Sequence, residues 1–236
     1  MDSVQLSVFR FDPETDKEPR YCDYQVPVKE GTTLLEGLLW IVDNFDGSLS
    51  FRYSCREAIC GACGLFVNGK YRLACKTQIR ELGNGEVVVR PLPHLAVIKD
   101  LVVDLDRFWE KYRAIHPYLI ADRSGGQGFY QSHRDRQSLE EMLNCILCGC
   151  CYSGCPTVQT NPRYPGPAAL LKSYRFVADT RDKGGVERLR LVASEDGVWR
   201  CQTSLNCTET CPKEIKINSC IEALKEAARS VLGGNP

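Results

Sequence analysis

The chain has 236 residues, including 14 cysteines, and its 30 lysines and arginines equal its 30 aspartates and glutamates. This balance leaves no basic surplus, which disfavours nucleic acid as the main partner. No apolar run approaches the ~18 residues of a membrane span, and the N-terminus resembles neither a signal peptide nor a transit peptide. We therefore expect the chain to stay in a reducing cytoplasm, where clustered cysteines are more often metal ligands than disulfides.

The N-terminal part of the chain predicts two strands and then a helix. Residues 4–8 and 24–28 alternate apolar and polar side chains, which is the pattern of half-buried strands. Thr33 and Glu36 have the spacing of a capping box at a helix start. The apolar residues over 34–45 then recur at helical spacing, so a helix is expected there.

A hairpin and a last strand complete this part of the chain. Asn68-Gly69 separates two short apolar runs, 65–67 and 71–74, and this dipeptide is the strongest short hairpin signal. Residues 87–89 are three valines and predict a further strand. Strand, strand, helix, hairpin and strand is the order of a β-grasp ferredoxin, so we expect a small α+β domain.

The remainder of the chain predicts a second, mainly helical domain. Apolar residues over 97–112 follow helical spacing and predict a connecting helix, and two more helices are expected at 168–178 and 221–231. Convincing strand patterns are few beyond the first domain. We therefore divide the chain into an N-terminal domain of residues 1–104 and a C-terminal domain of residues 105–236.

The first cysteine group has the spacing C-x4-C-x2-C with a fourth cysteine further on: Cys55, Cys60, Cys63 and Cys75. This is the plant-type 2Fe-2S ligand pattern. Cys63 and Cys75 lie on either side of the predicted hairpin turn, so strand pairing brings them together. Gly61 and Gly64 let backbone N–H groups approach the sulfurs, and such hydrogen bonds help to set the reduction potential. Zinc is the alternative, but structural zinc sites usually have paired C-x2-C knuckles.

The second and third groups read as two versions of one motif. Cys145, Cys148, Cys151 and Cys155-Pro156 spell the bacterial ferredoxin run, whose fourth cysteine serves the other cluster of a pair. The partner run consists of Cys201, Ser204, Cys207 and Cys211-Pro212. A serine therefore stands where the second cysteine of this run is expected.

In this motif the fourth cysteine of each run binds the cluster of the other run, so each motif cysteine can be assigned to one of two clusters. The 4Fe-4S ligands are Cys145, Cys148, Cys151 and Cys211. The remaining thiols, Cys155, Cys201 and Cys207, predict a 3Fe-4S cluster. A 4Fe-4S cluster with Ser204 as a ligand is the alternative, although an alkoxide matches iron less well than a thiolate here. The leftover Cys22, Cys150 and Cys220 are expected to be small buried apolar residues.

Together these motifs resemble the iron–sulfur subunit of succinate dehydrogenase and fumarate reductase. The resemblance covers nearly the whole chain and includes Ser54–Gly61, Asn68–Cys75, Ile98–Asp104, Cys145–Cys148, Gly166–Ala168 and Cys211–Lys213. It implies a subunit between an FAD-containing flavoprotein and a membrane anchor that binds quinone and often haem b. Electrons would pass from flavin through 2Fe-2S, 4Fe-4S and 3Fe-4S to quinone, or in reverse. It also implies a peripheral protein on the cytoplasmic face of a prokaryotic cytoplasmic membrane, with substrate chemistry left to the flavoprotein.

Two departures from the family pattern concern the quinone. Many ubiquinone-linked members have tryptophans shortly after the Cys-Pro of the second group, whereas residues 157–161 contain none. The histidine that often follows the first cysteine of the third group is Gln202. These differences favour a menaquinone-linked enzyme, with Pro156 as the one quinone contact we would name.

Three functions compete at this stage. The first is the electron-transfer subunit of a succinate:quinone oxidoreductase, or of a quinol:fumarate reductase that runs in reverse. The second is the iron–sulfur subunit of another flavoprotein complex, such as a thiol-dependent fumarate reductase or a glycolate oxidase. The third is a non-enzymatic zinc or scaffold protein, which stoichiometric zinc in place of iron and sulfide would identify.

Overall fold

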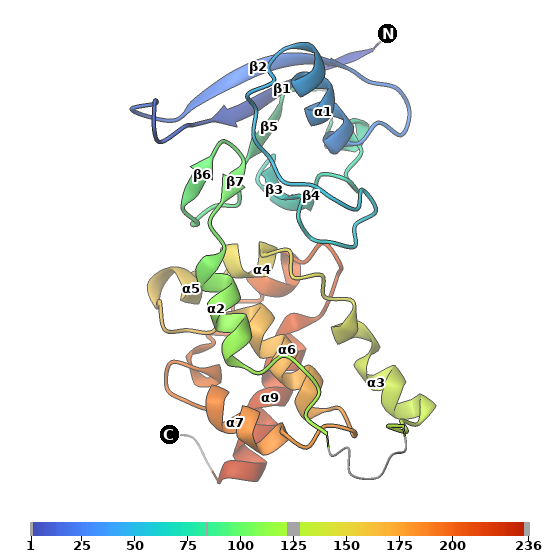
Figure 1. Ribbon diagram of the computed structural model, residues 1–236, viewed down its shortest axis with the longest axis vertical. Helices are drawn as coiled ribbons and strands as arrows, with labels where there is room; N and C mark the ends of the chain where they lie inside the picture. The colour runs from blue at the N-terminus through green and yellow to red at the C-terminus, as the bar shows by residue number, and fades with distance from the viewer. Residues whose placement is uncertain (1, 84, 122–127, 234–236) are drawn as a thin grey trace. The chain divides into compact units, whose positions relative to one another are not determined.

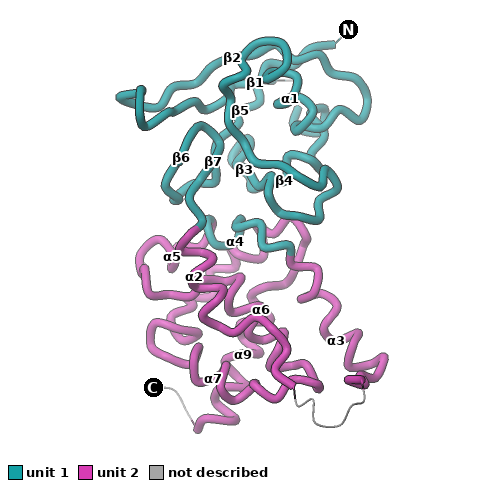
Figure 2. Tube along the Cα trace, viewed as in Figure 1, with its two compact units in different colours: residues 1–105, 146–153 teal, residues 106–145, 154–236 magenta. Residues whose placement is uncertain are grey.

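The computed structural model describes residues 2–83, 85–121 and 128–233. The chain divides into two compact units, unit 1 with residues 1–105 and 146–153, and unit 2 with residues 106–145 and 154–236 (Figure 2). Residues 146–153 carry Cys148, Cys150 and Cys151, and they belong to unit 1 although the segments on both sides of them belong to unit 2.

Unit 1 is built on a five-stranded sheet with the strand order β2-β1-β5-β3-β4 (Figure 1). Its strands are β1 (Ser3–Arg10), β2 (Arg20–Pro27), β3 (Gly64–Val67), β4 (Lys70–Leu73) and β5 (Val87–Arg90). Strand β1 pairs antiparallel with β2 and parallel with β5. The parallel pair requires a crossover, and the helix, the first cysteine loop and the hairpin lie within it. The β-grasp arrangement predicted from the sequence is therefore confirmed.

Helix α1 (Leu34–Asn44) begins at the predicted capping box. The Thr33 hydroxyl accepts a hydrogen bond from the Glu36 N–H at 3.2 Å, and the Glu36 carboxylate accepts one from the Thr33 N–H at 2.7 Å. Gly37 allows the helix to pack closely, because a Cβ atom there would lie 2.9 Å from the side chain of Ile79. The 3₁₀ helix that contains this isoleucine, η1, spans Ile79–Leu82.

The prediction of one helix over 97–112 is wrong in its first half. Strands β6 (Val97–Lys99) and β7 (Val102–Val103) form a separate two-stranded sheet, and α2 (Asp106–Ala114) is the only helical part. Asp100 lies in the turn between these strands with a φ of 47°, outside the right-handed helical region. The β-branched residues on both sides of the turn favour the extended conformation.

Tertiary hydrogen bonds explain why this turn forms. The buried Asp100 carboxylate accepts from Arg10 Nε at 2.9 Å, from the Phe11 N–H at 3.0 Å and from the Ser50 N–H at 2.9 Å. The Arg10 guanidinium also pairs with Asp46, whose pKa is lowered, first by the hydroxyl of a neighbouring serine and then by Arg10. A buried charge is stable only when it is paired and hydrogen-bonded in this way. These bonds outweigh the helical periodicity of the local sequence.

Unit 2 is helical. Its helices are α2, α3 (His133–Leu143), α5 (Pro156–Thr160), α6 (Pro167–Val177), α7 (Gly185–Val192), α8 (Asn206–Glu209) and α9 (Ile217–Leu232), with the 3₁₀ helix η2 (Val198–Arg200). The short α4 (Cys150–Ser153) belongs to unit 1. Helices α6 and α9, both predicted from the sequence, pack against each other. Across the described parts of the chain, we find no helix with the length and apolar character that crossing a membrane requires.

A buried ion pair lies within unit 2. Arg188 and Asp182 are both fully buried and in contact. Arg188 also donates to the backbone carbonyls of His116 at 3.1 Å and Tyr118 at 2.6 Å, and Asp182 accepts from the Ile120 N–H at 2.9 Å. The pair thus joins the segment after α2 to α7.

Candidate iron–sulfur sites

The first cysteine loop, between α1 and β3, surrounds Cys55 with backbone donors. Its Sγ accepts from the N–H groups of Glu57 at 3.4 Å, Ile59 at 3.3 Å and Cys60 at 3.3 Å. These three donors lower the pKa of Cys55 to about 6, because hydrogen bonds to the charged form favour it. The loop is therefore arranged for a thiolate, which is the form that binds metal.

The backbone of this loop adopts conformations that side chains normally disfavour. Arg56 and Ala58 have φ values of 60° and 56°, and Gly61 has 74°. For a residue with a side chain this region costs roughly 1–2 kcal/mol, and such strain tends to occur at functional sites. One result is that the Ala58 N–H donates to the sulfur of Cys75 at 3.2 Å. The strained backbone thus directs an amide to a second thiol.

Hairpin pairing brings Cys63 and Cys75 together, as the sequence predicts. Cys63 directly precedes β3 and Cys75 follows β4, and their Sγ atoms lie 3.3 Å apart with both thiols free. Burial raises the pKa of Cys63 to about 12. A bound cation deprotonates a coordinating thiol outright, so these buried thiols fit a site that metal completes. The four cysteines of this group therefore lie around one loop and one hairpin of unit 1.

The glycines of the first loop make room for the segment 146–153 of the same unit. A Cβ atom on Gly61 would lie 2.4 Å from the carbonyl oxygen of Ile146, and one on Gly64 would lie 3.1 Å from that of Cys148. The sequence suggested that these glycines expose amides to the sulfurs. The close approach of another chain segment is a second requirement, which the local spacing does not reveal.

Three further cysteines line one small pocket in unit 2. Cys155, Cys201 and Cys207 share this pocket with Ser204 and Tyr164. Burial raises the pKa of Cys207 to about 11 and also raises that of Cys155. Among the described residues that line the pocket there is no fourth cysteine, and Ser204 is exposed. This donor set can hold a cluster that takes three thiolates.

The two ferredoxin-like runs share a backbone feature. The second residue after Cys145 is Leu147, with a φ of 55°, and the second residue after Cys201 is Thr203, with a φ of 56°. Leu205, between Ser204 and Cys207, has a φ of 63°. Three residues with side chains thus hold left-handed conformations inside cysteine loops. The match of Leu147 and Thr203 supports the reading of the two runs as copies of one motif.

The cysteines predicted to bind 4Fe-4S are divided between the units. Cys148 and Cys151 lie in unit 1, and Cys145 and Cys211 lie in unit 2. Within unit 2, the partly buried Lys172 side chain on α6 donates to the carbonyl of Cys145 at 3.4 Å, and burial lowers its pKa. A lysine nitrogen thus lies beside the backbone of one predicted ligand.

The cysteines without a predicted ligand role differ in burial. Cys150 is fully buried among apolar side chains of unit 1, and Cys220 is buried in α9, as expected for small apolar residues. Cys22 on β2 is only partly buried, so that expectation is wrong there. Pro156, the one expected quinone contact, is the first residue of α5 and directly follows Cys155.

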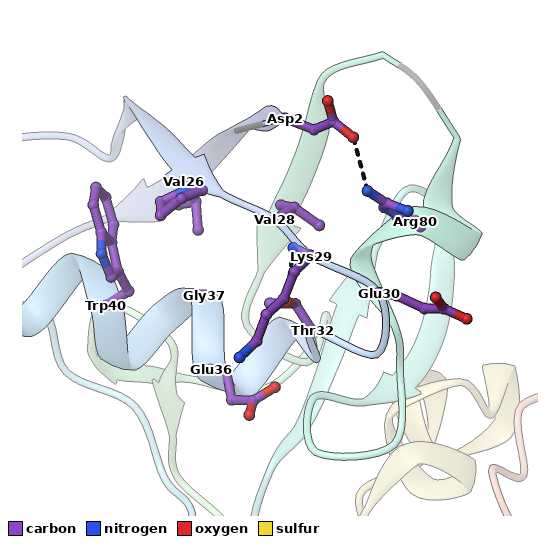
Figure 3. Close-up of a pocket in the computed structure, with 11 residues that line it drawn as sticks. Asp2, Val26, Val28, Lys29, Glu30, Thr32, Glu36, Gly37, Trp40 and Arg80 are labelled. Atoms are coloured by element: carbon purple, nitrogen blue, oxygen red, sulfur yellow. Dashed lines mark hydrogen bonds and ion pairs between the residues drawn. The ribbon is translucent and has the colours of Figure 1, made fainter.

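A separate pocket of about 630 Å³ lies in unit 1 between the end of β2 and α1 (Figure 3). Val26, Val28 and Trp40 give it an apolar lining, and Asp2 points to Arg80 across its edge at 2.7 Å. No cysteine is among the described residues that line it. This pocket is therefore distinct from the thiol sites.

Comparison with known proteins identifies the family. Residues 5–110 match the 2Fe-2S iron–sulfur cluster binding domain family, and residues 141–215 match the 4Fe-4S dicluster domain family. The chain is 40% identical over 226 residues to the succinate dehydrogenase iron–sulfur subunit of Coxiella burnetii, covering 94% of this chain and 95% of that protein. This chain belongs to the family of succinate dehydrogenase and fumarate reductase iron–sulfur subunits.

Two further relatives agree with this membership. The fumarate reductase iron–sulfur subunit of Haemophilus influenzae is 39% identical over 231 residues, covering 92% of this chain and 90% of that protein. A chain of the Mycobacterium smegmatis Sdh1 complex superposes with a TM-score of 0.87 at 28% identity, covering 97% of this chain and 96% of that one. The family and the α+β fold predicted from the cysteine spacing are thus confirmed.

The zinc alternative loses support from the same comparisons. Both matched domain families are described by their iron–sulfur clusters. Each thiolate of a polynuclear cluster binds one of several iron atoms, which is the chemistry that the family match indicates.

Proposed function

We propose that this chain relays electrons between FAD in a flavoprotein subunit and quinone at a membrane anchor, as part of a succinate:quinone oxidoreductase. Family membership over nearly the full chain carries this proposal. Succinate and fumarate chemistry belongs to the flavoprotein, so we assign no catalytic residue here. The subunit is peripheral to the membrane, on the cytoplasmic face of a prokaryotic cytoplasmic membrane, and the anchor supplies the quinone site and any haem b.

We assign eleven cysteines as ligands and keep residues 1–104 and 105–236 as the two cluster domains. The 2Fe-2S ligands are Cys55, Cys60, Cys63 and Cys75, the 4Fe-4S ligands are Cys145, Cys148, Cys151 and Cys211, and the 3Fe-4S ligands are Cys155, Cys201 and Cys207. When bound, the clusters supply electron-accepting centres whose potentials depend on hydrogen bonds and burial. The backbone donors to Cys55 stabilise negative charge on its sulfur.

The cofactor content is tested by electron paramagnetic resonance on the intact complex. We expect a signal from an oxidised 3Fe-4S centre and a separate 2Fe-2S signal after reduction. Ser204→Cys supplies the missing thiol and should replace the 3Fe-4S signal with that of a reduced 4Fe-4S cluster. Ser204→Ala is the control and should keep 3Fe-4S, because no alkoxide is then available. An oxidised wild-type complex without a signal would contradict the 3Fe-4S assignment.

We propose menaquinone as the quinone, with Pro156 near it. Residues 157–161 contain no tryptophan and Gln202 replaces the family's frequent histidine, which together support a pocket unlike the ubiquinone type. Steady-state assays of the complex with water-soluble menaquinone and ubiquinone analogues should give the higher kcat/KM for the menaquinone analogue. A preference for the ubiquinone analogue would contradict this part of the proposal.

The reverse direction is the second candidate, because the relative from Haemophilus influenzae is named a fumarate reductase subunit. Quinol:fumarate reduction uses the same chain of clusters with the electrons reversed. Comparison of kcat for succinate oxidation and for fumarate reduction in one preparation of the complex measures the bias directly. A larger kcat for fumarate reduction would favour this second candidate.

A further inference from the structure

Tyr164 is a polar side chain inside the three-thiol pocket of unit 2. It is only 1% exposed, and it lines this pocket together with Cys155, Cys201 and Cys207. The pattern of cysteines does not single out this tyrosine, and the electron relay described above gives it no role.

Hydrogen bonds hold the turn that contains Tyr164 in place. The Tyr164 N–H donates to the Asn161 carbonyl at 3.2 Å, and the Asn161 side chain donates to Asp196 at 2.7 Å. The Asn161 side-chain oxygen accepts from the Arg163 N–H at 2.9 Å, and the Arg163 guanidinium pairs with Asp196. The turn is therefore bonded on both sides, which fixes the backbone that carries Tyr164.

The chemistry of the two groups sets the direction of a hydrogen bond between them. The phenol of Tyr164 carries an O–H group that can donate, whereas a thiolate sulfur in the same pocket can only accept.

We propose that Tyr164 donates its hydroxyl hydrogen to a cysteine sulfur of this pocket and thereby raises the reduction potential of the cluster held by Cys155, Cys201 and Cys207. This inference rests on the proposed function, since it requires a cluster at these three cysteines. Reduction adds one electron and increases the negative charge on the sulfurs. A fixed donor stabilises the reduced state more than the oxidised state, so the potential rises. Tyr164 is thus a positioning residue that acts through a ligand.

Tyr164→Phe tests this role, because it keeps the ring and removes only the hydroxyl. Tyr174→Phe is the matched control, since Tyr174 is a half-buried tyrosine of the same unit beside the non-ligand Cys220. The measurement is a redox titration of the oxidised 3Fe-4S signal in the intact complex. We expect Tyr164→Phe to reduce the one-electron equilibrium constant several-fold, where tenfold corresponds to about 59 mV. The control should leave it unchanged, and both variants should keep the 2Fe-2S potential.

A second substitution covers the case in which Tyr164→Phe loses its cluster. Site-specific 3-fluorotyrosine at position 164 keeps the donor and makes it more acidic, so it should raise the potential. An unchanged potential in a Tyr164→Phe complex with full 3Fe-4S content would overturn the inference and leave the proposed function intact. If Tyr164→Phe loses the cluster, an unchanged potential with 3-fluorotyrosine would overturn it. Absence of the 3Fe-4S signal in the wild type would instead refute the cofactor assignment.

Discussion

Gly61 in the first cysteine loop and Gly69 in the hairpin turn both have left-handed backbone conformations. Gly61 has a φ of 74°, and a Cβ atom there would lie 2.4 Å from the Ile146 carbonyl oxygen. Gly69 in the hairpin turn has nearly the same φ, 76°, but apart from the glycine and its chain neighbours no atom lies within 4 Å of its Cβ position. The two positions therefore share the backbone requirement for glycine and differ in the space around them.

Gly61→Ala should destabilise unit 1 more than Gly69→Ala. In both variants an alanine must adopt a left-handed backbone conformation, which costs roughly 1–2 kcal/mol. In Gly61→Ala the new methyl group must also displace the Ile146 backbone. Urea unfolding, followed by loss of the visible 2Fe-2S absorbance, measures the difference. Equal losses in the two variants would show that segment 146–153 moves aside without a measurable change in stability.

Contacts between residues that a local motif spaces along the chain could be predicted from the sequence. Contacts between residues without such a motif could not. The hairpin turn constrains Cys63 and Cys75 to meet, and the 3.3 Å between their sulfurs agrees with that constraint. Tyr164 stands between two prolines and far from Cys201 along the chain. Only folding joins this pair, so no local pattern could have indicated it.

The capping box at α1 is the clearest link between a local motif and the stability of an element. Thr33→Ala removes the hydroxyl that accepts the Glu36 N–H and should lower the free energy of unfolding by about 1 kcal/mol. Thr33→Ser keeps the acceptor and should leave the free energy of unfolding nearly unchanged, because serine caps a helix at least as well as threonine. Both changes in the free energy of unfolding are measured by urea unfolding of preparations with the same cluster content. If Thr33→Ser destabilised the protein as much as Thr33→Ala, the stabilisation would come from the methyl group of Thr33 and not from its hydroxyl.

Helices and strands could be predicted where the local sequence pattern and the tertiary hydrogen bonds favour the same conformation. Helix α1 has a cap and a periodic apolar face, and both appear in the structure. Residues 97–105 have the periodicity alone, while the Asp100 carboxylate bonds with Arg10 and two backbone amides from distant segments. The sequence contains Arg10 and Asp100 but no sign that they meet. The membership of residues 146–153 in unit 1 could not be predicted for the same reason, because it depends on contacts with distant segments.

Each unit of the molecule contains a buried ion pair. In unit 1 the side chains of Arg10 and Asp100 are 5% and 2% exposed, and in unit 2 those of Arg188 and Asp182 are both 0% exposed. Truncating one partner of such a pair leaves an uncompensated buried charge, which costs about 3–5 kcal/mol. Replacing both partners with apolar residues removes most of that cost. A substitution in one ion pair should therefore lower the stability of the unit that contains it more than that of the other unit.

Arg188→Met should lower the temperature at which the signal of the proposed 3Fe-4S cluster is lost, with a smaller effect on the 2Fe-2S signal. Asp182 is then buried without its cation, in the same unit as Cys155, Cys201 and Cys207. Arg10→Met should give the reverse order, since Asp100 lies in the unit that holds the first cysteine loop. The double variant Arg188→Met with Asp182→Leu should recover most of the loss, because it removes both charges. Heating the complex in steps and recording both signals separates these outcomes. If both clusters are lost together in every variant, the two units unfold as one cooperative body.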